Sequence, residues 1–182
     1  MWEAYAVGTI PVGAVVADSD GAVVSRGRNR ILDDEVHGTQ LGRTRLAHAE
    51  INALLELDAS RTYESFTLYT ALEPCHLCLA AAFSARVGHV SFAGEDPYGG
   101  AVGRLVPGPD HLAWPVAVEG PLPGRAGLLP ELLHVAHHLW RLPDGNVMRL
   151  YRSTRPELVS GAERLPLPRT GATLDDAIAS LD

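Results

Sequence analysis

The stretch LYTALEPCHLC, residues 68–78, decides the fold that this sequence predicts. Its first half completes a run of strand-forming residues, 66–71, and its second half opens a helical segment, 75–86. A further apolar run, 89–93, follows that segment, so the order is strand, helix, strand. Strands joined through a helix lie parallel with a right-handed crossover. We therefore expect an α/β protein.

Segments on either side of this stretch extend the pattern. Residues 13–18 and 22–26 are rich in β-branched side chains and flank Ser19-Asp20-Gly21, which is a hairpin signal. Apolar residues recur at helical spacing after His48, which predicts a helix over 48–58. The same spacing predicts a helix over 128–140, whose apolar face would pack in the core or at a dimer contact.

Metal-binding residue types stand at the starts of two of these helices. Catalytic zinc typically takes three protein ligands, and one histidine with two cysteines is such a set. Cys75 and Cys78 are three residues apart, so on a helix they would lie about 5–6 Å apart on one face and could reach one ion. Pro74 suits a first helical position, and the positive end of the helix favours thiolates. With His48, the two cysteines complete the set.

His48 and Glu50 can share a pocket only where a helix begins. Residues two apart in the middle of a helix point about 200° from one another. The sequence therefore predicts that two helix starts meet at one ion, with Glu50 beside it as a general acid–base rather than as a ligand.

A C-x-x-C pair by itself is also typical of a structural zinc half-site, a redox pair or two buried thiols. The chain has 2 cysteines, both in this tetrapeptide, and no second pair of ligands at zinc-finger spacing. A catalytic zinc site is the favoured interpretation. His134, His137 and His138 form another histidine-rich pattern, but without a carboxylate partner we expect them at the surface.

The pattern H-x-E followed by P-C-x-x-C is the signature of zinc-dependent deaminases. The chain resembles the cytidine deaminase superfamily, above all bacterial tRNA adenosine deaminases and bacterial guanine deaminases. The likeness covers about residues 5–140 and is carried by IPVGAVV (10–16), GRNR (27–30), AHAEI (47–51), LYTALEPC (68–75) and ARV (85–87). It implies a three-layer α/β/α fold with a five-stranded mixed sheet and both metal-bearing helices on one face.

The resemblance also implies roles for individual residues. Zn²⁺ would be held by His48, Cys75 and Cys78, and Glu50 would be catalytic; substrate would be bound by Val12, Asn29, Ala49 and Asp96. Asp96 precedes Pro97, so it is equally typical of a turn residue. Ala71 stands where the tRNA enzymes carry threonine, and base recognition is therefore expected to differ.

Composition and charge narrow the class of partner. The chain has 182 residues, 46% hydrophobic and 20% charged, which suits one globular enzyme. It has no lysine, and residues 1–140 hold 9 arginines against 16 acidic residues, whereas nucleic-acid binding usually needs a basic face. A small-molecule amino-heterocycle is thus favoured over nucleic acid. We also expect a cytoplasmic homodimer, with neither a membrane span nor an export signal.

The two ends of the chain differ from the middle. We divide the sequence into a zinc-dependent deaminase domain, residues 1–140, and a C-terminal extension, residues 141–182, that packs on a neighbouring subunit or is partly disordered. Residues 1–9 are shorter than the helix that relatives carry before the first strand. Either that helix is truncated or the start site is misplaced.

Three functions are consistent with this sequence. The first is a hydrolytic deaminase in which zinc-activated water attacks a free nucleobase, nucleoside or related amino-heterocycle and ammonia is released. The second is a tRNA adenosine deaminase, which forms inosine. The third is a scaffold that zinc stabilises and that has no catalytic role.

Overall fold

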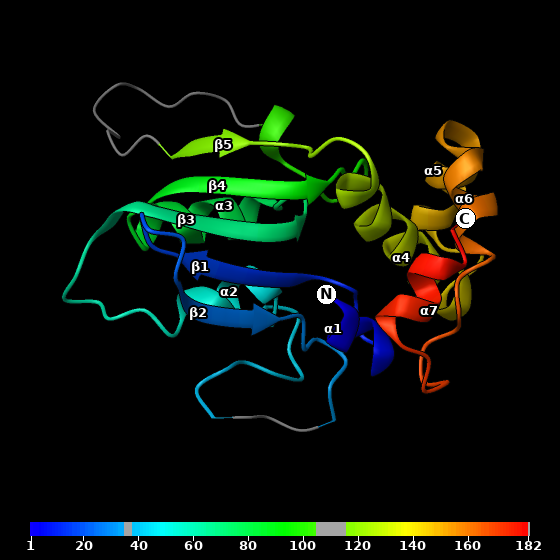
Figure 1. Cartoon of the computed structure of the whole chain (residues 1–182), viewed down its shortest axis with the longest axis horizontal. Coiled ribbons are helices and arrows are strands. Elements are labelled where there is room, and N and C mark those ends of the chain that lie inside the picture. The colour runs from blue at the N-terminus through cyan, green and yellow to red at the C-terminus, as the bar shows by residue number, and fades with distance from the viewer. Residues whose placement is uncertain (35–37, 105–115, 182) are drawn as a thin grey trace.

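A five-stranded mixed sheet forms the centre of the molecule (Figure 1). The structure is a computed structural model and describes residues 1–34, 38–104 and 116–181. The strand order is β2-β1-β3-β4-β5. The strands are β1 (Gly13–Ala17), β2 (Val23–Arg28), β3 (Tyr63–Leu72), β4 (Val87–Gly94) and β5 (Ala117–Glu119).

The direction of the strands follows their connections. β1 pairs antiparallel with β2 across the expected hairpin, and it also pairs antiparallel with β3. β3 and β4 are parallel, as are β4 and β5. The helix between β3 and β4 allows the chain to return to the same end of the sheet, which a short turn could not do. The predicted α/β class and mixed sheet are confirmed.

The described part of the chain also forms seven α-helices and one 3₁₀ turn. They are α1 (Trp2–Ala6), α2 (Ala49–Leu54), α3 (His76–Ser84), η1 (Val102–Arg104), α4 (Arg125–Arg141), α5 (Asn146–Thr154), α6 (Pro156–Ala162) and α7 (Leu174–Ala179). The helix expected over 48–58 ends one turn early, at Leu54. No helix in the described ranges is both long enough and apolar enough to cross a membrane.

The two faces of the sheet are covered differently. On one face, Val16, Leu68 and Val90 are neighbours across three strands and are buried with α2 and α3. On the other face, Val15 pairs with Tyr69, and 46% of the Tyr69 surface remains exposed. There α1 and the start of α4 cover one end of the sheet (Figure 1).

A second core joins α4 to the C-terminal helices. It is built from buried side chains of α1, α4, α5, α6 and α7. Tyr5 donates a hydrogen bond to the carbonyl of Pro166 at 2.8 Å, and the amide of Arg169 donates to the carbonyl of Ala6 at 3.0 Å. The C-terminal segment thus packs against α1 and α4 of its own chain. A domain boundary at residue 140, which would fall in the last turn of α4, and packing on a neighbouring subunit stay predictions.

Candidate functional site

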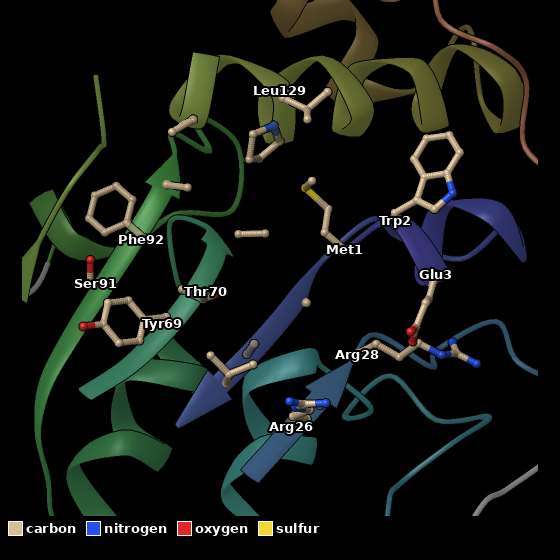
Figure 2. A pocket seen from close by; sticks show the side chains of 18 of the residues that line it. Met1, Trp2, Glu3, Arg26, Arg28, Tyr69, Thr70, Ser91, Phe92 and Leu129 are labelled. Atoms are coloured by element: carbon tan, nitrogen blue, oxygen red, sulfur yellow. The ribbon is translucent and has the colours of Figure 1, made fainter. Parts of the chain in front are cut away.

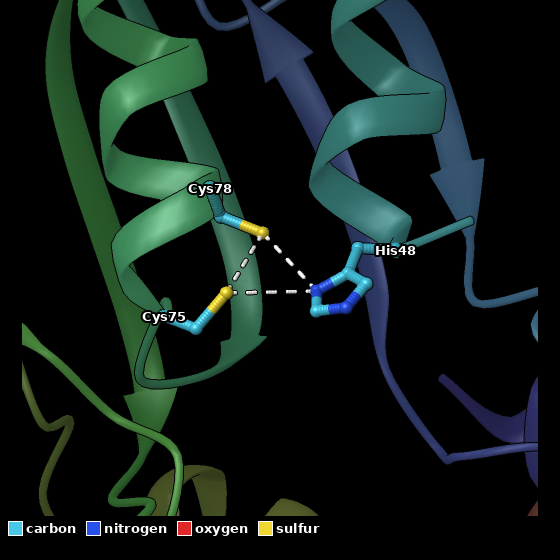
Figure 3. A group of neighbouring side chains, drawn as sticks. All are labelled: His48, Cys75 and Cys78. Atoms are coloured by element: carbon cyan, nitrogen blue, oxygen red, sulfur yellow. Dashed lines mark hydrogen bonds between the residues drawn. The ribbon is translucent and has the colours of Figure 1, made fainter. Parts of the chain in front are cut away.

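His48, Cys75 and Cys78 converge between the starts of two helices (Figure 3). His48 is the residue before α2 and Cys75 the residue before α3, both with extended backbone. Cys75 was expected inside the helix, but α3 begins at His76, and Cys78 lies in its first turn. The prediction that two helix starts meet at one site is therefore confirmed.

The spacing of these three side chains suits a tetrahedral metal. The two Sγ atoms are 3.6 Å apart, and His48 Nδ1 lies 3.6 Å from Cys75 Sγ and 3.4 Å from Cys78 Sγ. Tetrahedral zinc with ordinary bond lengths would place two sulfurs about 3.8 Å apart and a sulfur and a nitrogen about 3.6 Å apart. The donor set and its geometry both fit Zn²⁺.

The two thiols of the cluster differ in acidity. Hydrogen bonds from Cys78 and His48 lower the pKa of Cys75 to about 3, although burial opposes them. The pKa of Cys78 is raised, because its proton is held by Cys75 and because the group is buried. The hydrogen bond with Cys75 raises the pKa of His48. A metal ion that binds both thiolates would therefore release protons.

Glu50 lies in the first turn of α2 and is not part of the ligand set. Its side chain is 4% exposed, and Thr70 Oγ1 of β3 donates a hydrogen bond to Glu50 Oε1 at 3.0 Å. Burial raises the pKa of this carboxyl group. A carboxyl group held in this way, beside a metal site, suits transfer of a proton.

A cavity of about 290 Å³ adjoins the metal-binding cluster. It lies where the parallel strands β3 and β4 end, a usual place for ligands in α/β sheets. Three of the four predicted substrate-binding residues, Val12, Asn29 and Asp96, line it together with His48, Glu50 and Cys75. Ala49 is absent from the described lining, and its side chain is buried in the sheet core.

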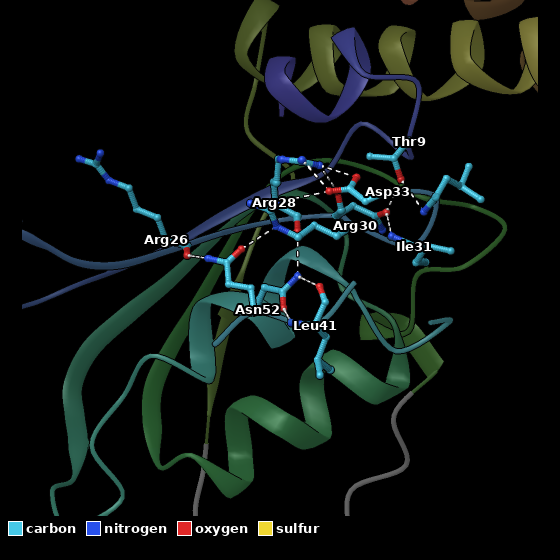
Figure 4. A network of polar contacts seen from close by, with 11 residues as sticks. Thr9, Arg26, Arg28, Arg30, Ile31, Asp33, Leu41 and Asn52 are labelled. Atoms are coloured by element: carbon cyan, nitrogen blue, oxygen red, sulfur yellow. Dashed lines mark hydrogen bonds and ion pairs between the residues drawn. The ribbon is translucent and has the colours of Figure 1, made fainter. Parts of the chain in front are cut away.

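Asn29 belongs to a polar network with Thr9, Arg28 and Asp33, which Figure 4 labels, and hydrogen bonds hold its side chain in one orientation. Its Oδ1 accepts from Thr9 Oγ1 at 2.9 Å and from the amide of Ile31 at 3.1 Å. Arg28 and Arg30, on either side of Asn29, both form ion pairs with Asp33. The amide nitrogen of Asn29, by contrast, has no hydrogen bond to the described residues, so it is free to donate to a ligand.

Asp96 serves the turn and also lines the cavity. Its Oδ1 accepts hydrogen bonds from the amides of Tyr98 and Gly99, at 3.0 and 2.9 Å. The neighbouring Glu95 forms an ion pair with Arg155, which also pairs with Glu131 of α4 at 2.8 Å. The C-terminal helices thereby fix the loop that carries Asp96.

Sequence reasoning missed the contribution of α4. His134 and His138 line the cavity, and His134 is 6% exposed. The expectation of a surface position was wrong for His134 and His137, which are buried where the C-terminal core packs on α4, whereas His138 is half-buried. Their helical spacing with buried leucines was the only signal that could have shown it.

A larger cavity, about 640 Å³, lies on the other face of the sheet. Leu129 of α4 and Trp2 of α1 border it above strands that carry Tyr69 and Arg26 (Figure 2). None of its described lining residues is a histidine or cysteine. The chemistry described above therefore belongs to the smaller cavity.

Comparison with known proteins supports this description. The family model of the cytidine and deoxycytidylate deaminase zinc-binding region matches residues 1–94. The chain is 35% identical over 102 residues to a tRNA-specific adenosine deaminase of Bacillus subtilis, which covers 54% of this chain and 58% of that protein. It is 38% identical over 128 residues to a tRNA(Ile)-lysidine synthase of Deinococcus radiodurans, covering 68% of this chain and 20% of that protein.

A solved structure gives the same fold. It comes from work on A-to-I editing by tRNA:A34 deaminases, with 28% sequence identity and a TM-score of 0.52 over 66% of this chain and 84% of that chain. The chain thus spans about a fifth of the Deinococcus radiodurans relative and somewhat over half of the Bacillus subtilis relative.

Proposed function

Because this chain belongs to the cytidine and deoxycytidylate deaminase zinc-binding family, we propose that it is a zinc-dependent hydrolase that removes an amino group from a nitrogen heterocycle. One observation carries the proposal. Three metal-binding side chains converge at a cavity that is lined by two of them, His48 and Cys75, and by a buried carboxyl group outside the ligand set.

The proposed ligands are His48, Cys75 and Cys78, and the proposed proton carrier is Glu50. Bound zinc supplies a nucleophilic water at neutral pH by lowering the pKa of that water. Glu50 accepts the proton of this water and delivers it to the ring nitrogen beside the carbon that carries the amino group. A new carbon–oxygen bond forms. Glu50 then takes the remaining proton from the added hydroxyl group and passes it to the amino group, the carbon–nitrogen bond breaks, and ammonia leaves a carbonyl behind. Thr70 positions the carboxyl group through its hydrogen bond.

We propose a free base or a nucleoside as the substrate. The volume of the cavity is at the lower end for ligand sites. No arginine is among the described residues that line it, and the chain has no lysine, so the described lining offers neither type of cation to a phosphate. The amide nitrogen of Asn29 and the backbone around Val12 would contact the ring.

The second candidate is deamination of an adenosine in tRNA. Its support is the similarity to a tRNA-specific adenosine deaminase and to a structure from the study of tRNA:A34 deaminases. In this case the nucleotide would have to leave its stack to enter the cavity, and its phosphates would remain outside.

We propose that the enzyme is a homodimer in a reducing compartment, the cytoplasm. Both cysteines are free although their sulfurs lie close together, and metal binding requires that they stay reduced. Leu77 and Phe83 of α3 are 39% and 38% exposed, which suits contact with a second subunit.

The test is ammonia release by zinc-loaded protein from free bases, nucleosides and an anticodon stem-loop RNA. Glu50→Gln is the control, since it keeps the size of the side chain but removes its proton transfer. Turnover should fall by about 10²–10⁴-fold while the zinc content stays the same. Activity on the RNA alone would favour the second candidate. If no substrate reacts, or if the variant is fully active, the proposed function is wrong.

A further inference from the structure

His134 of α4 offers hydrogen-bonding atoms that the fold does not use. Its side chain is 94% buried by its neighbours, with 6% exposed, and it lines the candidate active-site cavity. Neither ring nitrogen has a hydrogen-bond partner in the described part of the chain. A buried polar group without a partner is costly, so its presence calls for a role.

The described residues that surround His134 do not offer its ring nitrogens a hydrogen-bond partner. The neighbouring residues Leu133 and Val135 are fully buried and apolar. The rings of His138 and Tyr151 lie nearby, with centroids 4.7 and 6.1 Å away. The hydroxyl of Tyr151 also has no hydrogen-bond partner among the described residues. The contacts around the ring are therefore packing contacts.

The charge state of His134 determines what it can offer. Burial lowers the pKa of the imidazole, against the opposing effect of Asp96, so the ring is neutral at pH 7. A neutral imidazole has one N–H donor and one nitrogen acceptor. Amino-substituted heterocycles carry matching ring nitrogens, carbonyls and N–H groups.

The position of His134 in the cavity differs from that of the residues proposed to carry out the reaction. Glu50 and the metal ligands come from α2 and from the start of α3, and Asn29 follows β2. His134 comes from α4, a separate element. A heterocycle whose amino group faces Glu50 and the metal still has a non-reacting edge to be recognised.

We propose that His134 is a substrate-binding residue that hydrogen-bonds the non-reacting edge of the heterocycle in the deaminase cavity. This inference rests on the proposed function. His138 packs against His134 and restricts its ring. The hydrogen bond exists in the bound substrate as well as in the transition state, so its loss raises KM and changes kcat little.

The test compares His134→Leu with His137→Leu. His137 is a matched control, because it is on the same helix, is 1% exposed and has an unpartnered Nδ1, but does not line the cavity. Binding of purine, 2-pyrimidinone and the riboside of each, none of which has an amino group to lose, is measured by calorimetry on zinc-loaded protein. His134→Leu should weaken Kd about tenfold, whereas His137→Leu should change it less than twofold.

Two further measurements separate binding from folding. His134→Gln restores a donor and an acceptor and should recover most of the affinity. His134→Leu should leave Tm unchanged or raise it, because an apolar side chain replaces unpartnered polar atoms. If the wild type binds none of these four compounds, the proposed function fails and the inference with it. If the wild type binds and His134→Leu stays within twofold, or loses affinity only together with Tm, the inference alone is overturned.

Discussion

Replacement of Asp33 by asparagine tests how the polar network around Asn29 is held together (Figure 4). Arg28 donates two hydrogen bonds to the Asp33 carboxylate, at 2.9 and 2.7 Å, and Arg30 donates one at 2.9 Å. The side chains are nearly buried, with 7% of Asp33, 15% of Arg28 and 14% of Arg30 exposed. Asparagine would leave two largely buried guanidinium groups without their anion.

The size of the destabilisation depends on which hydrogen bonds the two arginines retain in the variant. Removal of one partner of a buried ion pair typically costs about 3–5 kcal/mol. Arg28 still donates to the carbonyl of Asn29 at 3.0 Å, and Arg30 still donates to Gln40 at 2.8 Å. We therefore expect Asp33→Asn to lower the free energy of unfolding by about 2–4 kcal/mol, which corresponds to roughly 4–16 °C in Tm for a domain of this size.

The pH dependence of stability provides a second test of the contact between Asp33 and the two arginines. Burial by itself would raise the pKa of Asp33, but the hydrogen bonds and charges of Arg28 and Arg30 outweigh it and lower the pKa. A lowered pKa in the folded state adds stability above the unfolded value, about 3.9, and this stability is lost as the pH falls through the folded value. The difference in the free energy of unfolding between wild type and variant should therefore be largest near pH 7 and should decrease in acid.

The assay is thermal and urea unfolding at pH 7 and at about pH 3, with Asp34→Asn as the control. Asp34 is exposed and its replacement makes the same change in net charge. Because Asn29 lines the cavity, Asp33→Asn should also raise KM. Equal shifts in Tm for Asp33→Asn and Asp34→Asn would refute the reasoning. So would a loss of stability in Asp33→Asn that is as large at pH 3 as at pH 7.

Two remaining predictions concern the metal and the loop that carries Asp96. Cys78→Ala should reduce bound zinc from one equivalent to near zero and lower Tm, because two ligands hold the ion poorly. Metal analysis measures the zinc content, and thermal unfolding measures Tm. Full zinc occupancy in the variant would contradict the ligand assignment. Arg155→Met should lower the free energy of unfolding by about 1–3 kcal/mol and raise KM, because it removes the cation that joins Glu95 to the nearly buried Glu131. Urea unfolding measures the loss of stability and steady-state kinetics measure KM, with replacement of the exposed Arg152 by methionine as the control. Equal effects of the two substitutions would contradict the role of this contact.

The local sequence was sufficient for most of the sheet and for the metal cluster. Alternation of β-forming residues and the turn at Gly21 predict β1 and β2, and the helix between β3 and β4 predicts their parallel direction. His48 and Cys75 could be placed at helix starts because capping positions and spacing are local properties of the chain. The start of β3 at Tyr63, earlier than expected, depends on pairing with Val87, which is a contact between distant segments.

The contribution of α4 to the cavity could not be derived from the sequence. His134 lies 84 residues after Glu50, and its own neighbours in sequence predict only an amphipathic helix. Its burial depends on Tyr151 and the other C-terminal residues that pack on α4. Ala49, which the family resemblance places among the substrate-binding residues, has its side chain in the core beneath the sheet, and only the packing of its helix shows this.

By itself, then, the sequence determined the class of fold, the donor atoms for zinc and the carboxyl group beside them, because residue type, spacing and helix starts are sufficient for these. The tertiary structure decided which distant side chains complete the cavity, which charges hold its loops and which histidines are buried. The physical reason is that burial and long-range contacts arise from the packing of whole elements, and one face of a helix acquires a role only from what packs against it.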